Sequence, residues 1–236
     1  MCTVSFVFAN GKTIITSNRD EKVLRPSAIE PQKYSINHKE IYFPKDQKAG
    51  GTWYAVSENG TVLVLLNGAE EKHQLKSFYR KSRGLIVLDI ISSNNQIAFW
   101  DSLDLSDIEP FTLVLFQDSK LYQLRWNEIA KETLSLNVTQ NHIWSSSTLY
   151  SKEIRDKRAN WFNEFLEDNL QINEQELFNF HRHTEEGNQE HSLVINRNDS
   201  LKTLSITQTV IEKNKVVLLH HDLQQQKDFT NIIITI

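Results

Sequence analysis

The sequence predicts an α+β protein in which helices are layered on a large antiparallel sheet. Segments with β character come first, helical patterns follow, and β character returns toward the C-terminus. The 236 residues include only 7 Gly and 4 Pro, which argues against low-complexity linkers, and we expect residues 1–236 to form a single domain. Hydrophobic residues make up 39% of the chain, and the 10% of aromatic residues supply large side chains for a core.

The β character is clearest in three pairs of segments that are separated by residues typical of turns. These predicted hairpins are 3–8 with 13–16, 52–56 with 61–66, and 111–116 with 120–126. Residues 62–66 are all apolar, which predicts a strand that is covered on both faces. Further strands are expected at 192–195, 203–211, 215–221 and 230–236.

Three helices are predicted, over 77–91, 152–166 and 174–181. The middle one has the strongest pattern, because its apolar side chains fall on one stripe with charged residues opposite. That stripe consists of Ile154, Trp161, Phe162, Phe165 and Leu166.

The composition excludes several classes of protein. The single Cys, at position 2, cannot form an internal disulfide or supply a zinc or iron–sulfur cage, so no metal or cofactor is predicted. The net charge of −4, with both signs dispersed, argues against a nucleic-acid partner. Apolar runs such as 62–66 are much shorter than the roughly 20 residues of a membrane-spanning helix. Without a secretory signal pattern, we expect a cytoplasmic protein with no membrane span.

Cys2 directly follows the initiator Met, which is usually removed when the next side chain is small. Removal would place a free α-amino group, with a pKa of about 7.7–8.0, beside the Cys2 thiol, where it could act as a general base. A nucleophile activated by an N-terminal amine is a known route to acyl transfer. The alternative is a frayed terminus without a role, and the position of Cys2 alone favours that alternative.

The polar motif 18–21, Asn-Arg-Asp-Glu, directly follows the second predicted strand. If the first two strands form a hairpin, this motif returns to the end of the sheet where Cys2 lies. Arg19 could then lower the pKa of the thiol and hold a substrate oxygen, and Asp20 could orient the α-ammonium group. A charged turn that makes a surface salt bridge is an equally good interpretation of the spacing.

The motifs at the N-terminus resemble the family named after its Asn-Arg-Asp-Glu sequence (the NRDE family), to which the transport and Golgi organisation 2 proteins of eukaryotes belong. The resemblance covers mainly the first half of the chain. It is carried by residues 1–3, 17–21, 25–26, 43–46, 49–53, 65–68, 79–84 and 109–112, and more weakly by 144–147.

That family is in turn similar to the N-terminal-nucleophile (Ntn) hydrolases, in particular to the branch with bile salt hydrolases and penicillin V acylases. The resemblance implies a four-layer αββα sandwich, with Cys2 as nucleophile, Arg19 and Asp20 orienting it, and Asn67 donating to the oxyanion. Asn67 ends the apolar strand, where its amide could serve an oxyanion hole or simply belong to an Asn-Gly turn.

We expect Asn18, Trp53 and Ser146 to contact the substrate, although Trp53 also fits a core position. Two features depart from the family pattern. Ser145-Ser146 stands where many relatives carry Ser-Asn, and residues 202–205 lack the Arg that many relatives carry before a late strand. His181 and His183 are interpreted as surface residues and His220-His221 as structural ones.

The leading hypothesis is a hydrolase that acts on an amide or acyl bond of a small molecule through a Cys2 thioester. The first alternative is a non-catalytic binding or trafficking protein for a hydrophobic ligand such as heme or lipid, which the family resemblance suggests. The second is an interaction protein in which the motif only braces the hairpin. The sequence predicts neither the substrate nor the oligomeric state.

Overall fold

The computed structural model describes residues 3–169 and 171–234, which form two compact units. Among the described residues, the terminal unit combines 3–25 with 139–169 and 171–234, and the central unit comprises 26–138. Each unit contains one antiparallel sheet and helices, so the predicted α+β class is confirmed. The strand and helix patterns alone predicted one large sheet, whereas the family resemblance implied the two sheets of an αββα sandwich, and the structure contains two sheets.

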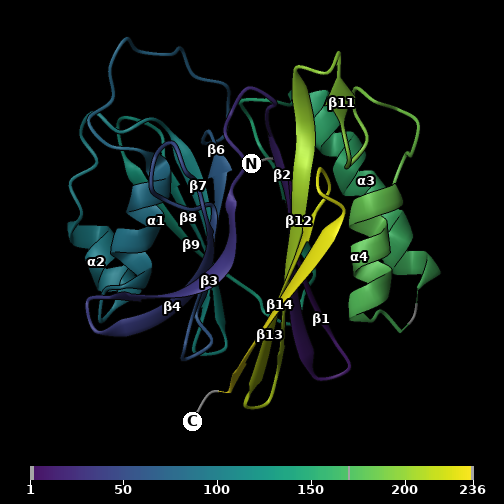
Figure 1. Cartoon of the computed structure of the whole chain (residues 1–236), viewed down its shortest axis with the longest axis horizontal. Coiled ribbons are helices and arrows are strands. Elements are labelled where there is room, and N and C mark those ends of the chain that lie inside the picture. The colour runs from purple at the N-terminus through teal and green to yellow at the C-terminus, as the bar shows by residue number, and fades with distance from the viewer. Residues whose placement is uncertain (1–2, 170, 235–236) are drawn as a thin grey trace. The chain divides into compact units, whose positions relative to one another are not determined.

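The sheet of the terminal unit has the strand order β10-β1-β2-β12-β13-β14, with β11 paired to β12 (Figure 1). The long strands β2 and β12 run side by side at its centre, and every described pairing is antiparallel. The strands are β1 (Thr3–Ala9), β2 (Lys12–Lys22), β10 (His142–Ser145), β11 (Asn196–Arg197), β12 (Leu201–Glu212), β13 (Lys215–Asp222) and β14 (Lys227–Ile234).

Helices α3 (Lys152–Asp168) and α4 (Glu174–His183) cover one face of this sheet (Figure 1). Their apolar side chains share a core with residues of β1, β2 and β12: Val7, Ile14, Phe162, Leu177, Phe180 and Val210. Because side chains alternate along a strand, Ile14 places the even-numbered residues of β2 on the helix-covered face and the odd-numbered ones on the opposite face. Asn18 and Asp20 therefore belong to the helix-covered face, and Ser17 and Arg19 to the other.

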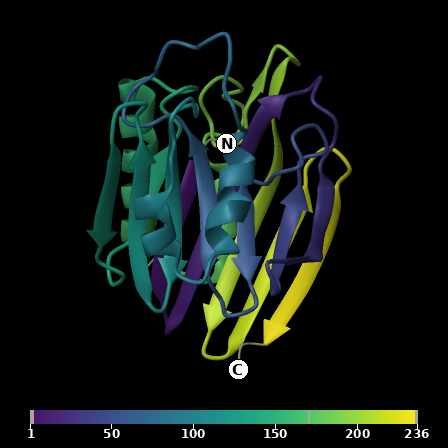
Figure 2. The ribbon, with the colours of Figure 1, turned by 90° about the vertical axis from the view of Figure 1, so that its left-hand side faces the viewer.

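The central unit has a sheet of strand order β3-β4-β5-β6-β7-β8-β9, and α1 and α2 pack on it (Figure 2). Buried Trp100 of α2 joins these layers, because it packs edge-on against Phe111 and donates a 3.0 Å hydrogen bond to Thr133 Oγ1. The elements are β3 (Ile29–Ile36), β4 (Lys39–Lys45), β5 (Tyr54–Ser57), β6 (Val62–Asn67), α1 (Arg83–Ile91), α2 (Gln96–Ser102), β7 (Phe111–Gln117), β8 (Lys120–Trp126) and β9 (Lys131–Leu136).

The start of α1 touches the segment before β5 so closely that only glycine fits. A Cβ atom on Gly51 would lie 2.3 Å from the carbonyl carbon of Gly84, and one on Gly84 would lie 2.9 Å from the oxygen of Thr52. The backbone N–H of Thr52 donates a 3.1 Å hydrogen bond to Gly84 O. These glycines therefore fix how α1 meets the sheet.

The three predicted hairpins and the helices beginning at Lys152 and Glu174 are confirmed. The helix expected over 77–91 begins only at Arg83. The preceding segment is held by the loop before β7 instead, since Arg80 donates from its backbone N–H to Asp107 O and from Nε to Ser106 O. The strand expected at 192–195 is irregular, and β3, β4, β9, β10 and α2 were not predicted. Across 3–169 and 171–234, no helix has the length and apolar character needed to cross a membrane.

Candidate active site

The Asn-Arg-Asp-Glu motif lies inside β2, not in a turn after it. The prediction was wrong because β2 continues to Lys22, where it pairs with the distant strand β12. Asn18, Arg19 and Asp20 are only 0%, 4% and 2% exposed. This burial contradicts the alternative of a charged surface turn.

The register of the first hairpin places Thr3 opposite Asn18, at the end of β1 where the described chain begins. Cys2 itself, the proposed nucleophile, lies outside the described residues. On the other side of β2, Arg19 is opposite Ser205 and Asp20 is opposite Thr203. The motif is therefore held between two strands that are far apart in the sequence.

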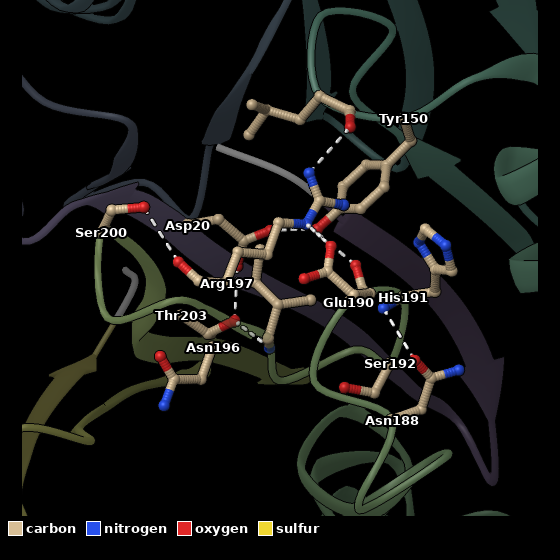
Figure 3. Close-up of polar contacts among 12 residues, drawn as sticks. Asp20, Tyr150, Asn188, Glu190, His191, Ser192, Asn196, Arg197, Ser200 and Thr203 are labelled. Atoms are coloured by element: carbon tan, nitrogen blue, oxygen red, sulfur yellow. Dashed lines mark hydrogen bonds and ion pairs between the residues drawn. The ribbon is translucent and has the colours of Figure 1, made fainter.

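The carboxylate of Asp20 accepts hydrogen bonds from two buried hydroxyl groups (Figure 3). Tyr150 donates to Oδ2 at 2.6 Å, and Thr203 donates to Oδ1 at 2.5 Å. The hydroxyl of Thr203 in turn accepts the backbone N–H of Ile195 at 2.9 Å. Each carboxylate oxygen has its own donor, so the orientation of Asp20 is fixed from both sides.

Two arginines hold Tyr150 in place. The guanidinium carbon of Arg158 lies 3.6 Å from the centre of the Tyr150 ring and that of Arg197 lies 5.1 Å from it, which are cation–π distances. Arg158 is fully buried and donates to Thr3 Oγ1 and to Ser192 O, both at 2.5 Å. Arg158 therefore connects α3 to the first described residue of β1 and to the ring that holds Asp20.

Asn18 belongs to a buried polar network with α4. Its amide nitrogen donates to the carbonyl oxygens of His181 and Leu193 at 3.0 and 2.7 Å, and its amide oxygen bonds His181 Nδ1. His181 Nδ1 is thus the protonated nitrogen, and Nε2 accepts from the Ser5 hydroxyl at 2.7 Å. These contacts give Asn18 a bracing role, and its contact with a substrate stays a prediction.

His181 was predicted to be a surface residue, and this was wrong because the imidazole is fully buried between α4 and the sheet. Burial, together with the charge of Arg158, lowers the pKa of His181 to about 3, so the ring is neutral near pH 7. Within 3–169 and 171–234, no group of three His, Cys, Asp or Glu side chains could hold a metal ion.

The sheet face that carries Arg19 also carries two hydroxyl groups that the sequence did not single out. Ser17 Oγ and Ser205 Oγ are buried, and neither has a hydrogen-bond partner among the described residues. Ser205 lies directly opposite Arg19, and Ser17 is two residues before it on the same strand. Unpaired buried hydroxyls are uncommon and mark positions where a ligand or a water molecule could bind. The register between β2 and β12, which relates Ser205 to Arg19, is not visible in the sequence.

The remaining predicted site residues are distributed over both units. Asn67 is half-buried at the end of β6 in the central unit, where Gly68, with φ of 84°, leads into a long irregular segment instead of a hairpin turn. Trp53, in the same unit, is 4% exposed, which agrees with a core position. Its contact with a substrate stays a prediction. Ser146 is buried in the terminal unit, and its hydroxyl bonds Thr148 Oγ1 at 2.9 Å.

A model of the protein family described as Transport and Golgi organisation 2 matches residues 1–229. The chain belongs to this family. Membership confirms the resemblance seen in the N-terminal motifs, and the match extends it over almost the whole chain. A search of curated proteins finds no match for this member of the family.

Among solved structures, the chain is similar to two variants of conjugated bile acid hydrolase from Clostridium perfringens, with TM-scores of 0.62 and 0.58. Both are 10% identical, and the matches cover 98% of this chain and 92% or 96% of theirs. An N-acylethanolamine-hydrolyzing acid amidase orthologue from Caenorhabditis elegans has a TM-score of 0.63 at 10% identity, over 88% of this chain and 92% of its own. These likenesses show that this family member has the α+β sandwich fold of Ntn hydrolases.

Proposed function

We propose that the chain is an Ntn hydrolase that cleaves an amide or acyl bond of a small molecule, with Cys2 as the nucleophile after removal of Met1. One observation carries the proposal. Thr3 is paired with Asn18, so Cys2 directly precedes a residue held beside the buried motif. The fold supports it, because the similar structures include proteins named as a hydrolase and an amidase.

The reaction has two steps. The α-amino group of Cys2 takes the thiol proton, Sγ bonds to the acyl carbon, and the C–N bond breaks as the proton passes to the leaving amine. Water then attacks the thioester carbon while the α-amino group of Cys2 takes a proton from the water, the C–S bond breaks to release the carboxylic acid, and the proton returns to Sγ to restore the thiol. We assign donation to the oxyanion to Asn67.

Arg19 and Asp20 have separate roles in this proposal because they belong to opposite faces of β2. Arg19 lowers the pKa of the Cys2 thiol and shares its face with the unpaired hydroxyls of Ser17 and Ser205, which can bind polar groups of the substrate. Asp20, whose carboxylate is fixed by Tyr150 and Thr203, orients the α-ammonium group of Cys2. A reactive thiol needs a reducing compartment, and we propose the cytoplasm.

The chain contains a single thiol, so modification of Cys2 can be measured without interference from other cysteines. Intact mass first establishes whether Met1 has been removed. We expect a β-lactone acyl probe to label the native protein at Cys2 faster than it labels free cysteine, with the Arg19→Gln variant about tenfold slower. Cys2→Ala should abolish labelling, and Lys22→Gln, at the exposed end of the same strand, should leave the rate unchanged. A native N-terminal Cys that reacts no faster than free cysteine would contradict the proposal.

A binding or trafficking protein for a hydrophobic ligand such as heme or lipid is the second candidate. It is favoured by Ser146, which stands where many relatives carry an amide donor and whose hydroxyl is already bonded to Thr148. Cys2→Ala separates the two functions, because a carrier keeps its ligand affinity and its cellular function, whereas an enzyme loses turnover.

A further inference from the structure

A cavity of about 480 Å³ lies in the terminal unit, between α4 and strands β12 to β14. Its volume is within the range of small-molecule sites. Phe178 and Leu219 supply an apolar surface, and Gln208 and Arg182 are two of the polar side chains that line the cavity. The cavity is on the helix-covered face of the sheet, whereas Arg19 is on the opposite face, so it is separate from the candidate active site.

Gln208 brings an unused hydrogen-bond acceptor to this cavity. The side chain is 2% exposed, and its amide nitrogen donates to Thr16 Oγ1 at 2.9 Å and to Glu174 O at 3.1 Å. These two acceptors fix the orientation of the amide. Its carbonyl oxygen accepts no hydrogen bond from the described residues. This oxygen is not sealed from solvent, so a ligand N–H or O–H that enters the cavity can reach it.

Arg182 brings unused donors. One guanidinium nitrogen donates to His221 Nε2 at 2.5 Å, and His221 Nδ1 bonds Asp228. Since arginine can only donate, His221 Nε2 is the acceptor, and the ring is neutral with its proton directed to Asp228. The other N–H groups of Arg182 have no partner among residues 3–169 and 171–234. They form a fork suited to a carboxylate.

The acidic residues near the cavity do not neutralise this guanidinium directly. The carboxylate of Glu174 pairs with Lys12, whose Nζ lies 3.3 Å from both of its oxygens. Asp228 is engaged by His221, which separates it from Arg182. Both carboxylates line the cavity but are already paired, so the groups left for a ligand include the guanidinium of Arg182, the amide oxygen of Gln208 and an apolar wall.

We propose that this cavity binds a small organic carboxylate that also carries a hydrogen-bond donor and an apolar body. The carboxylate binds Arg182, the donor binds the carbonyl oxygen of Gln208, and the apolar body packs against Phe178 and Leu219. Cys2 takes no part, so the site is independent of the proposed hydrolase activity.

The probe for this site is N-acetyl-L-phenylalanine, which has all three features. Two analogues each lack one of them: N-acetylphenylalaninamide has no carboxylate, and 3-phenylpropanoate has no N–H donor. The full-length Cys2→Ala protein is used for the titration because it cannot cleave the probe. Binding is measured by calorimetry and by the NMR shifts of the Leu219 methyl groups. The native protein should bind the probe with the same affinity, so failure of the hydrolase proposal would leave this result unchanged.

We expect Arg182→Gln to weaken binding of the probe about tenfold or more and to leave the weak binding of the amide analogue unchanged. Gln208→Met should weaken binding of the probe but not binding of 3-phenylpropanoate. Arg155→Gln, on the neighbouring helix and outside the cavity, is the matched control. It should change the affinity neither for the probe nor for 3-phenylpropanoate. If Gln208→Met does not fold, weaker binding of 3-phenylpropanoate than of the probe to the Cys2→Ala protein tests the same contact. Equal affinity of these two ligands would contradict the role of Gln208.

The proposal is overturned by any of three results. The first is the absence of saturable binding of N-acetylphenylalanine at millimolar concentration. The second is equal affinity of the probe for Arg182→Gln and its parent protein. The third is a pattern of NMR shifts that leaves Leu219 unaffected, which would place the bound probe elsewhere.

Discussion

The hydroxyl of Tyr150 donates a 2.6 Å hydrogen bond to the carboxylate of Asp20, although the two residues are 130 positions apart in the sequence. Both side chains are 2% exposed. Because Thr203 supplies the second donor, the carboxylate keeps its orientation through contacts with segments on both sides of α3 and α4 in the sequence. The orientation of the Asp20 side chain therefore depends on the fold of the whole terminal unit.

Tyr150→Phe removes a hydroxyl donor from the buried carboxylate of Asp20. We expect the free energy of unfolding to fall by about 1.5–3 kcal/mol, the range for a hydrogen bond to a charged group. Urea denaturation measures the change. Tyr122→Phe is the matched control, because the Tyr122 hydroxyl makes no hydrogen bond within the described chain, and its effect should stay within about 0.5 kcal/mol. Equal effects of the two variants would contradict the role of Tyr150.

The local parts of this arrangement could be predicted from the sequence. Asn10-Gly11 between two β-rich segments predicted the first hairpin, and that hairpin brings Thr3 to Asn18. The family motifs singled out Arg19 and Asp20. The fold class followed from the order of strand and helix patterns, since each pattern depends on neighbouring residues.

The long-range parts could not be predicted. Thr203 donates to Asp20 from 183 positions away, and no spacing in a single sequence reports such a contact. The end of β2 was placed too early for the same reason, because polar residues at 18–21 stay in a strand only through pairing with β12. His181 was assigned to the surface because its partners, Asn18 and Ser5, lie on distant strands.

Arg158→Met should strongly destabilise the protein. The side chain is fully buried, and its loss leaves the carbonyl oxygens of His191 and Ser192 and the hydroxyl of Thr3 without their charged donor. Hydrogen bonds to charged groups contribute about 1.5–3 kcal/mol each, so we expect a loss of about 3 kcal/mol or more by urea denaturation.

Lys157→Met on the same helix is the control for the Arg158 variant. Its side chain is 53% exposed and pairs only with Glu153 among the described residues, so the change should be at most a few tenths of a kcal/mol. If Arg158→Met loses no more stability than Lys157→Met, the guanidinium of Arg158 contributes little to the stability of the protein.

His181 should make the protein sensitive to acid. Its pKa is about 3 in the folded protein and about 6.5 in an unfolded chain, so between these values the unfolded state binds more protons. The stabilising contribution of the neutral ring is complete above pH 6.5 and is lost as pH falls toward 3, by at most about 1.4 kcal/mol per pH unit.

The test of this pH dependence is urea denaturation of the native protein and of His181→Gln between pH 4 and 7.5. Gln cannot titrate, so the variant should lose less stability on acidification, whatever its stability at pH 7.5. His183→Gln, two residues along the same helix and exposed, should keep the native slope. Parallel curves for the native protein and His181→Gln would contradict the assignment.

Gly84→Ala tests whether close backbone contact fixes the start of α1 in the central unit. The new Cβ would lie 2.9 Å from the carbonyl oxygen of Thr52, a distance that real Cβ atoms essentially never show. Because the obstructing atom belongs to the backbone, the helix or the segment before β5 must shift, and we expect a loss of about 1–3 kcal/mol. Hydrogen exchange supplies an internal control: protection should fall for the amides of α1 and for Thr52, which donates to Gly84 O, but not for those of α4 in the terminal unit. If stability is unchanged, or if protection falls equally in both units, the contact is not what positions the helix.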